Sequence, residues 1–154
     1  MKTLELRRHA RRDPVADRLS PDGRADAEDA GRSSSGRYDV VFVSPAHRAA
    51  ETAAWFLRGA GVQLADHAVV PGLGGHDASG GSPEGMAAGV RALLDQMDDG
   101  WTGLAISHTP LVERAALGLT GREVGPMAEL DGLEITRSDD GRIDVVELRR
   151  PRPS

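Results

Sequence analysis

The chain has 154 residues, a formal net charge of −5 at pH 7 and no cysteine. The lack of cysteine excludes disulfide scaffolds, thiolate metal sites and cysteine-based phosphatase chemistry, and the acidic balance argues against a nucleic-acid partner. The length fits one domain, and no apolar run approaches the roughly 18 residues of a membrane span, so we expect a cytoplasmic protein without a membrane partner.

The first half of the chain alternates strand and helix signals. A short strand over residues 3–7 ends at Arg8 and His9, and Ser20-Pro21 is a favoured helix start for a polar helix that runs to about residue 31. The apolar, β-branched run at 40–43 is typical of a buried parallel strand. An amphipathic helix follows it and ends at the glycines of residues 59–61.

The second half repeats this alternation and then changes. A short strand is expected at 69–70, followed by a glycine-rich loop over 71–85, a helix from Pro83 with an apolar stripe over 86–97, a strand at 104–107 and a helix at 111–119. Residues 133–136 and 143–148 indicate a β-hairpin that turns at 139–141.

This order of elements predicts the fold class. Alternating strands and helices indicate a three-layer α/β/α sandwich with a mainly parallel central sheet, here closed by the C-terminal hairpin. We expect one domain over residues 1–148 and a flexible, basic, proline-containing tail over 149–154. Ligands of such sheets bind at the carboxyl ends of the strands, so the search for a site narrows to three strand ends.

Each of these three strand ends carries residues that suit a phosphate. They read Arg-His at residues 8–9, Ser-Pro-Ala-His-Arg at 44–48 and Ser-His-Thr-Pro at 107–110. Arginine offers a planar fork of donors that matches phosphate oxygens. Histidine serves near neutral pH as a nucleophile or as a donor.

At these residues the sequence resembles the histidine phosphatase superfamily, whose fold is that of phosphoglycerate mutase. Its Arg-His-Gly signature is similar to Arg-His-Ala at residues 8–10, and three further stretches match in order over roughly residues 2–121. They are Leu-Ser-Pro-Asp-Gly-Arg-Ala at 19–25, Ser-Pro-Ala-His-Arg-Ala-Ala-Glu-Thr-Ala at 44–53 and Ile-Ser-His at 106–108. In size the chain resembles the small SixA-like phosphohistidine phosphatases.

The resemblance implies a metal-independent phosphatase that needs no cofactor. His9 would attack phosphorus and form a phosphohistidine that water then hydrolyses. Arg8, Arg48 and His108 would bind the phosphoryl oxygens, and Arg12 is a further phosphate-contact candidate. The substrate would be a small phosphomonoester or a phosphohistidine protein. A neutral His9 and a donating His108 together predict a bell-shaped pH profile.

The general acid is left open between three residues. The family's mutases carry a glutamate in the region that here holds His76 and Asp77. Asp77 is the candidate we name first, with His76 and Glu84 as alternatives.

Two departures from the family pattern bear on this interpretation. Ala10 replaces a glycine and does not tolerate positive φ as glycine does. Glu5 and Arg7 stand at positions that are usually apolar, and they need each other or water if they are buried.

Other functions are weighed beside the phosphatase. A phosphoglycerate mutase-like phosphotransferase would use the same nucleophile, and a module that binds a phosphorylated ligand without turnover would keep the arginines. A zinc site built from His9, His47, His76 and His108 is the weakest alternative, because the flanking arginines repel a cation.

Overall fold

The computed structural model describes residues 1–64 and 66–151. The predicted elements are confirmed with small shifts at their ends. Within the described residues the strands are β1 (Lys2–Arg8), β2 (Val40–Val43), β3 (Ala68–Val69), β4 (Thr102–Ser107), β5 (Gly132–Arg137) and β6 (Ile143–Leu148). The helices are α1 (Pro21–Arg32), α2 (His47–Ala60), α3 (Pro83–Gln96) and α4 (Leu111–Thr120), and part of the predicted loop forms a 3₁₀ helix, η1 (Pro71–Gly74).

The strands form one mixed sheet in the order β3-β2-β4-β1-β5-β6. The first four strands in this order are parallel to one another. Strand β5 pairs antiparallel with β1, and β6 pairs antiparallel with β5. The α/β class, the largely parallel centre and the C-terminal hairpin agree with the prediction. The central strands β2, β4 and β1 therefore end at the same edge of the sheet.

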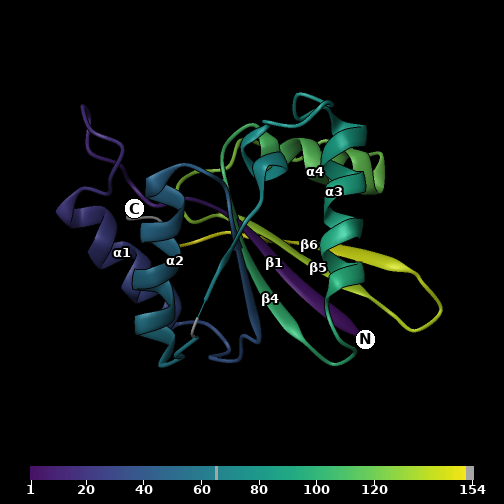
Figure 1. Ribbon diagram of the computed structural model, residues 1–154, viewed down its shortest axis with the longest axis horizontal. Helices are drawn as coiled ribbons and strands as arrows, with labels where there is room; N and C mark the ends of the chain where they lie inside the picture. The colour runs from purple at the N-terminus through teal and green to yellow at the C-terminus, as the bar shows by residue number, and fades with distance from the viewer. Residues whose placement is uncertain (65, 152–154) are drawn as a thin grey trace.

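The helices cover the two faces of the sheet as pairs (Figure 1). Helices α1 and α2 lie together on one side, and α3 and α4 lie on the other. Side chains alternate across β1 to match. Leu4 and Leu6 belong to the apolar cluster under α3 and α4, whereas Arg7 lies over the ring of Phe56, which belongs to the cluster on the α1 and α2 side. The observed layers are those of an α/β/α sandwich.

Two glycines let α1 and α2 approach closely. A Cβ at Gly31 would lie 1.8 Å from the Phe56 carbonyl oxygen, and a Cβ at Gly59 would lie 1.9 Å from the Glu28 carbonyl oxygen. Any larger side chain at either position would push the two helices apart. This contact fixes α2, whose first turn carries Arg48.

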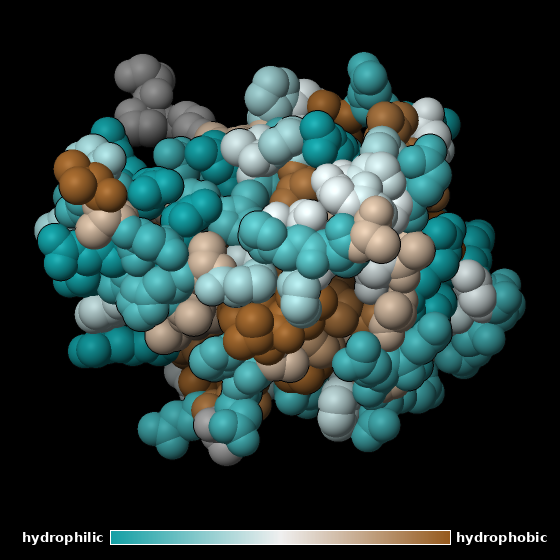
Figure 2. Space-filling model, turned by 45° about the horizontal axis from the view of Figure 1, so that its top comes forward, coloured by the Kyte–Doolittle hydropathy of each residue, from teal (hydrophilic) through white to brown (hydrophobic). Residues whose placement is uncertain are grey.

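The surface agrees with the polar composition of the chain. The face in Figure 2 is mainly hydrophilic, with an apolar area near its middle and smaller apolar spots toward its edges. None of the described helices is both long and apolar enough to cross a membrane.

The start of the predicted tail is bonded to the rest of the protein. The Arg149 guanidinium donates to the carbonyl oxygens of Gly125 and Pro126, and the Arg150 amide donates to Asp131 Oδ1 at 2.8 Å. Residues 152–154, the rest of that tail, lie outside the described residues.

Candidate active site

Three neighbouring strands deliver the predicted site residues to one edge of the sheet. Arg8 ends β1, and His9 follows it. His108 follows β4, while Arg48 lies in the first turn of α2, after β2. Because β2, β4 and β1 are adjacent and parallel, their carboxyl ends meet, and the His9 amide donates to the Ser107 carbonyl oxygen at 3.0 Å.

The ring of His9 is held in one tautomer. It is only 6% exposed, and its Nδ1 lies 2.7 Å from the Ala10 carbonyl oxygen. A carbonyl only accepts, so Nδ1 carries the proton and Nε2 carries the lone pair. The structure thus leaves Nε2 as the nucleophilic atom of His9.

Ala10 fits its position without strain. Its φ is not positive; of the non-glycine residues in the described ranges, Leu130 alone has a positive φ. The Ala10 amide donates to Thr52 Oγ1 at 3.0 Å, and the Thr52 hydroxyl donates to the Arg48 carbonyl oxygen at 2.7 Å. Thr52 therefore ties the backbone after His9 to the helix that carries Arg48.

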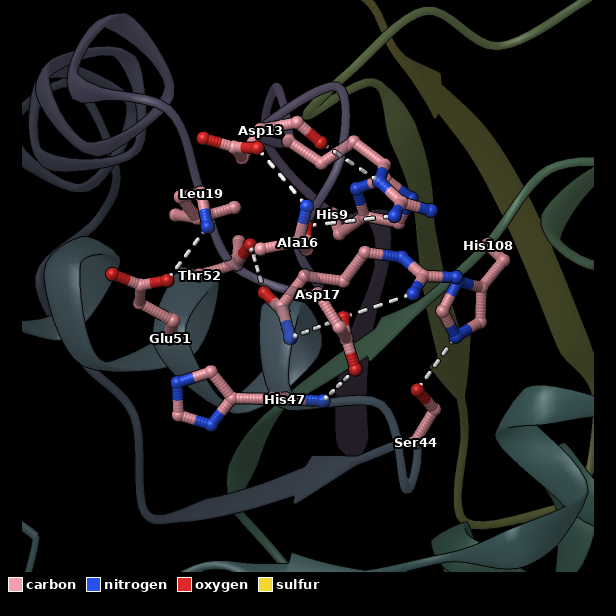
Figure 3. A network of polar contacts seen from close by, with 12 residues as sticks. His9, Asp13, Ala16, Asp17, Leu19, Ser44, His47, Glu51, Thr52 and His108 are labelled. Atoms are coloured by element: carbon pink, nitrogen blue, oxygen red, sulfur yellow. Dashed lines mark hydrogen bonds and ion pairs between the residues drawn. The ribbon is translucent and has the colours of Figure 1, made fainter.

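His108 is oriented by two polar neighbours (Figure 3). Its Nδ1 lies 3.3 Å from Arg48 Nη2, and its Nε2 lies 2.6 Å from Ser44 Oγ. A guanidinium can only donate, so Nδ1 is the acceptor and Nε2–H donates to the hydroxyl of Ser44. The rings of His9 and His108 stand edge to face with centroids 5.2 Å apart.

Asp17 holds both Arg48 and the start of α2. Its carboxylate accepts from Arg48 Nη1 at 2.9 Å and from the backbone amides of His47 and Arg48. Ala46, the N-cap residue just before α2, offers no side-chain cap. Asp17 supplies this cap from a distant loop and turns the guanidinium toward His108.

Arg8 and Arg48 each keep one buried nitrogen without a partner. Arg8 Nη1 donates to the Met127 carbonyl oxygen at 2.9 Å, but Arg8 Nε and Arg48 Nε have no hydrogen-bond partner among the described residues. Buried donors are nearly always paired in folded proteins. Arg8 Nε and Arg48 Nε are exceptions to this rule, and the charges of both arginines act on His9.

A pocket of about 600 Å³ joins most of these groups. Its lining residues include both histidines of the site, Arg48, His76 and the glycines of the loop after β3: His9, Pro45, Ala46, Arg48, Gly74, Gly75, His76, Gly80, His108, Thr109, Pro110 and Leu111. Larger surface hollows occur elsewhere, such as one of about 990 Å³ at the end of α2. They lack the convergence of histidine and arginine seen here, so we take the smaller pocket as the candidate active site.

Burial and positive charge both act on the two histidines. Desolvation lowers the pKa of His9, and the charges of Arg48 and Arg8 lower it further, against the opposing bond to Ala10. Desolvation, with His9 and Arg48 nearby, lowers the pKa of His108 to about 4. Both rings are therefore neutral at pH 7 in the unliganded protein, so a charged, donating His108 requires the opposite charge of a bound phosphate.

Four of the predicted residues are not among those that line the pocket: Arg8, Arg12, Asp77 and Glu84. The Asp77 carboxylate accepts from the amide and hydroxyl of Ser79, and it lines a separate small cavity; these bonds lower its pKa, so it stays ionised. Glu84 is exposed in the first turn of α3, and Arg12 is exposed and donates to backbone oxygens of its own loop. Of the acid candidates, only His76 lines the pocket.

The comparison with protein-family models decides the family. The model of the histidine phosphatase superfamily (branch 1) matches residues 5–115, well over half of the chain. The chain belongs to the histidine phosphatase superfamily. A search of curated protein sequences gave no match. Membership of this superfamily supports phosphatase activity.

Solved structures show the same fold as this chain. The protein histidine phosphatase SixA complexed with tungstate aligns with a TM-score of 0.76 and 21% identity, over 96% of each chain. Phosphoserine phosphatase from Entamoeba histolytica aligns with a TM-score of 0.77 and 15% identity, over 99% of this chain and 98% of the other. Mycobacterial glucosyl-3-phosphoglycerate phosphatase aligns with a TM-score of 0.73 and 16% identity, over 98% and 100%.

Sequence reasoning missed Asp17 and gave Ser44 no role of its own. Asp17 lies in a loop between Arg12 and Leu19, where no periodicity marks it. The signal that points to it is indirect, because a helix that begins after Ala46 needs a cap from elsewhere. The sequence also raised a zinc site as an alternative. The described residues contain no group of three or more histidine, aspartate or glutamate side chains arranged to hold a metal ion.

The lowered pKa values predict how this protein responds to pH. We expect ¹H–¹⁵N spectra of the rings to show Nδ1–H for His9 and Nε2–H for His108 at pH 7, with His108 titrating near pH 4. Between about pH 4 and 6.5, His108 binds more protons in the unfolded chain than in the native one. Its contribution to the free energy of unfolding therefore falls as the pH falls through this range. Bound vanadate should raise the pKa of His108; a charged His108 at pH 7 without ligand would contradict the assignment.

Proposed function

We propose that this protein is a phosphatase that hydrolyses a phosphomonoester or a phosphohistidine through a covalent phosphohistidine on His9. The observation that carries the proposal is the fixed tautomer of His9, whose Nδ1–H donates to the Ala10 carbonyl oxygen. Nε2 is left with its lone pair in a pocket that also contains Arg48 and His108. A neutral imidazole held in this way needs no base to activate it.

The reaction has two displacements at phosphorus. In the first, His9 Nε2 bonds to phosphorus while the bond from phosphorus to the leaving oxygen or nitrogen breaks. In the second, a water oxygen bonds to phosphorus, the Nε2–phosphorus bond breaks and inorganic phosphate leaves. The Ala10 carbonyl oxygen keeps its bond to Nδ1–H throughout and stabilises the positive ring of the intermediate.

Arg8, Arg48 and His108 bind the phosphoryl oxygens in both steps. Negative charge gathers on these oxygens in the transition state, where preorganised donors act most strongly. The Arg48 guanidinium lines the pocket together with both histidines and is the donor best placed for these oxygens. His108 becomes a charged donor once the phosphate dianion raises its pKa.

His76 is the proton donor in this proposal. It lines the pocket and lies close enough to His108 to lower the pKa of that ring. As an imidazolium it gives a proton to the leaving atom, and as a neutral ring it then takes a proton from the attacking water. We do not assign this role to Asp77, because its carboxylate is bonded within its own turn.

The substrate is proposed at the level of chemical class. The pocket selects a phosphoryl group on a small molecule or on a histidine of a protein, and no step uses a metal or an organic cofactor. The compared structures include a protein histidine phosphatase, a phosphoserine phosphatase and a glucosyl-3-phosphoglycerate phosphatase. These names define the substrate panel for the test.

The test combines this panel with a chemical trap. The protein is incubated with ³²P-labelled phosphohistidine protein, phosphoserine, a phosphosugar and a phosphoglycerate, and both inorganic phosphate and labelled protein are measured. Release of phosphate with an acid-labile, alkali-stable phosphoprotein supports the proposal. An acid-stable phosphoprotein contradicts it, transfer to a second hydroxyl without phosphate release indicates a mutase, and vanadate binding without turnover indicates a binding module.

A further inference from the structure

A buried ion pair lies in β1 just before the active site. Glu5 and Arg7 are 6% and 8% exposed, and Arg7 Nη2 and Nε donate to Glu5 Oε1 at 2.8 and 3.1 Å. The Tyr38 hydroxyl donates to Glu5 Oε2 at 2.9 Å, and the Arg7 guanidinium lies over the Phe56 ring. The two charges that the sequence left unexplained therefore satisfy each other beneath α1 and α2.

One nitrogen of Arg7 makes a hydrogen bond outside its contacts with Glu5 and Phe56. Arg7 Nη1 donates to the Leu130 carbonyl oxygen at 3.0 Å. Leu130 is 2% exposed and has a φ of 68°. A leucine adopts this left-handed conformation only where its surroundings hold it there.

The backbone around Leu130 also holds Arg8, the proposed phosphate ligand. The Leu130 amide donates to the Arg8 carbonyl oxygen at 3.0 Å, and the Arg8 amide donates to the Asp131 carbonyl oxygen at 2.9 Å. The Arg8 guanidinium donates to the Met127 carbonyl oxygen in the same segment. Residues 127–131 therefore connect the buried Arg7 to the Arg8 side chain.

We propose that Glu5 and Arg7 are positioning residues, which set the Arg8 guanidinium at the phosphate site by fixing residues 127–131. Glu5 and Tyr38 orient the Arg7 fork, and Arg7 Nη1 fixes the strained Leu130 carbonyl. The role in catalysis rests on the proposed function, because it takes Arg8 to be a ligand of the phosphoryl group.

Energetics favour a positioning role over a stabilising one. A buried ion pair adds little net stability, and apolar residues of similar volume often replace it at no loss. Apolar residues cannot replace the hydrogen bond that Arg7 donates to the Leu130 carbonyl oxygen. Burial, and then the Glu5 carboxylate, raise the pKa of Tyr38, which keeps its hydroxyl protonated as a donor to Glu5.

The experiment replaces the cluster and keeps the fold. The variant Glu5→Leu, Arg7→Met, Tyr38→Phe is compared with Arg137→Met, which removes an arginine from the far end of β5 and breaks its bond to Asp95. Thermal unfolding checks that both variants are folded. If the triple variant does not fold, Tyr38→Phe alone serves, because it loosens Glu5 without leaving a charge unpaired.

Two measurements test the positioning role. The first is hydrogen exchange at the amides of Arg8 and Leu130, which does not depend on catalysis. The second is vanadate affinity, measured with and without Arg8→Met. We expect faster exchange and about tenfold weaker vanadate binding in the triple variant, the factor that a hydrogen bond from a charged donor is worth. Arg137→Met should change neither.

The outcomes separate this inference from the proposed function. If the triple variant binds vanadate more weakly than the wild type, but this difference is absent when both proteins also carry Arg8→Met, positioning through Arg8 is supported. Exchange and affinity as in the wild type, or a loss of affinity that persists without Arg8, would overturn it. If exchange rises while the wild-type protein neither binds vanadate nor turns over phosphates, the positioning of Arg8 stands and the proposed function fails.

Discussion

Replacing His9 with alanine is expected to lower kcat by at least about 10³-fold, because the variant has no atom to accept the phosphoryl group. The pocket would still contain Arg48 and His108, so vanadate binding should persist. The labelled phosphoprotein should vanish, since its phosphoryl group resides on Nε2. The measurement is release of inorganic phosphate together with the acid-labile trap.

His47→Ala is the matched control for this prediction. His47 is exposed, its ring lies away from His108 in Figure 3, and its backbone amide, which the variant keeps, is the group that bonds to Asp17. We expect this variant to retain activity. Turnover that survives in His9→Ala would remove His9 as the nucleophile, and the mechanism with it.

Replacing Arg48 with lysine is expected to lower kcat by about 10²-fold with a much smaller change in KM, as for the loss of one transition-state donor. Lysine keeps the positive charge that attracts the substrate. Arg48 contacts Asp17 through one nitrogen of its planar guanidinium and His108 through another. Lysine has a single nitrogen and cannot make both contacts in this geometry. The separation of kcat from KM is therefore the diagnostic measurement.

Arg58→Lys provides the control from the same helix. Its side chain is 69% exposed and lies 3.9 Å from Glu28, far from any group of the pocket. This variant should have the kinetics of the wild type. Wild-type turnover in Arg48→Lys would show that the fork of Arg48 is peripheral, and an equal loss in both variants would point to a general effect of substitutions in α2.

Local sequence signals were sufficient for most of the fold. Ser20 caps α1 through the Gly23 amide, as the Ser-Pro start predicted, and the apolar run at 40–43 is the buried strand β2. These features depend on neighbouring residues, so a sequence contains them directly. The turn of the β-hairpin was likewise predicted from local sequence, at residues 139–141, and Gly141 has a φ of 89° there.

The site was predictable where chain order and topology act together. Arg8, His9, Arg48 and His108 follow three strands, and the parallel order of those strands brings them together. Asp77 shows the limit of this reasoning: it is two residues from the lining Gly75, yet its carboxylate turns back to Ser79. Sequence position alone does not give the direction of a side chain in a glycine-rich loop.

The sequence by itself determined the order of strands and helices, the family motifs and the four residues proposed to bind the phosphoryl group. Only the tertiary structure decided that Asp17 caps α2 and holds Arg48, that His9 presents Nε2, and that His108 is neutral before a ligand binds. It also decided that Glu5 and Arg7 are paired beneath the site. The physical reason is that burial, hydrogen-bond direction and pKa depend on groups far apart in the chain, which meet only when the sheet has formed.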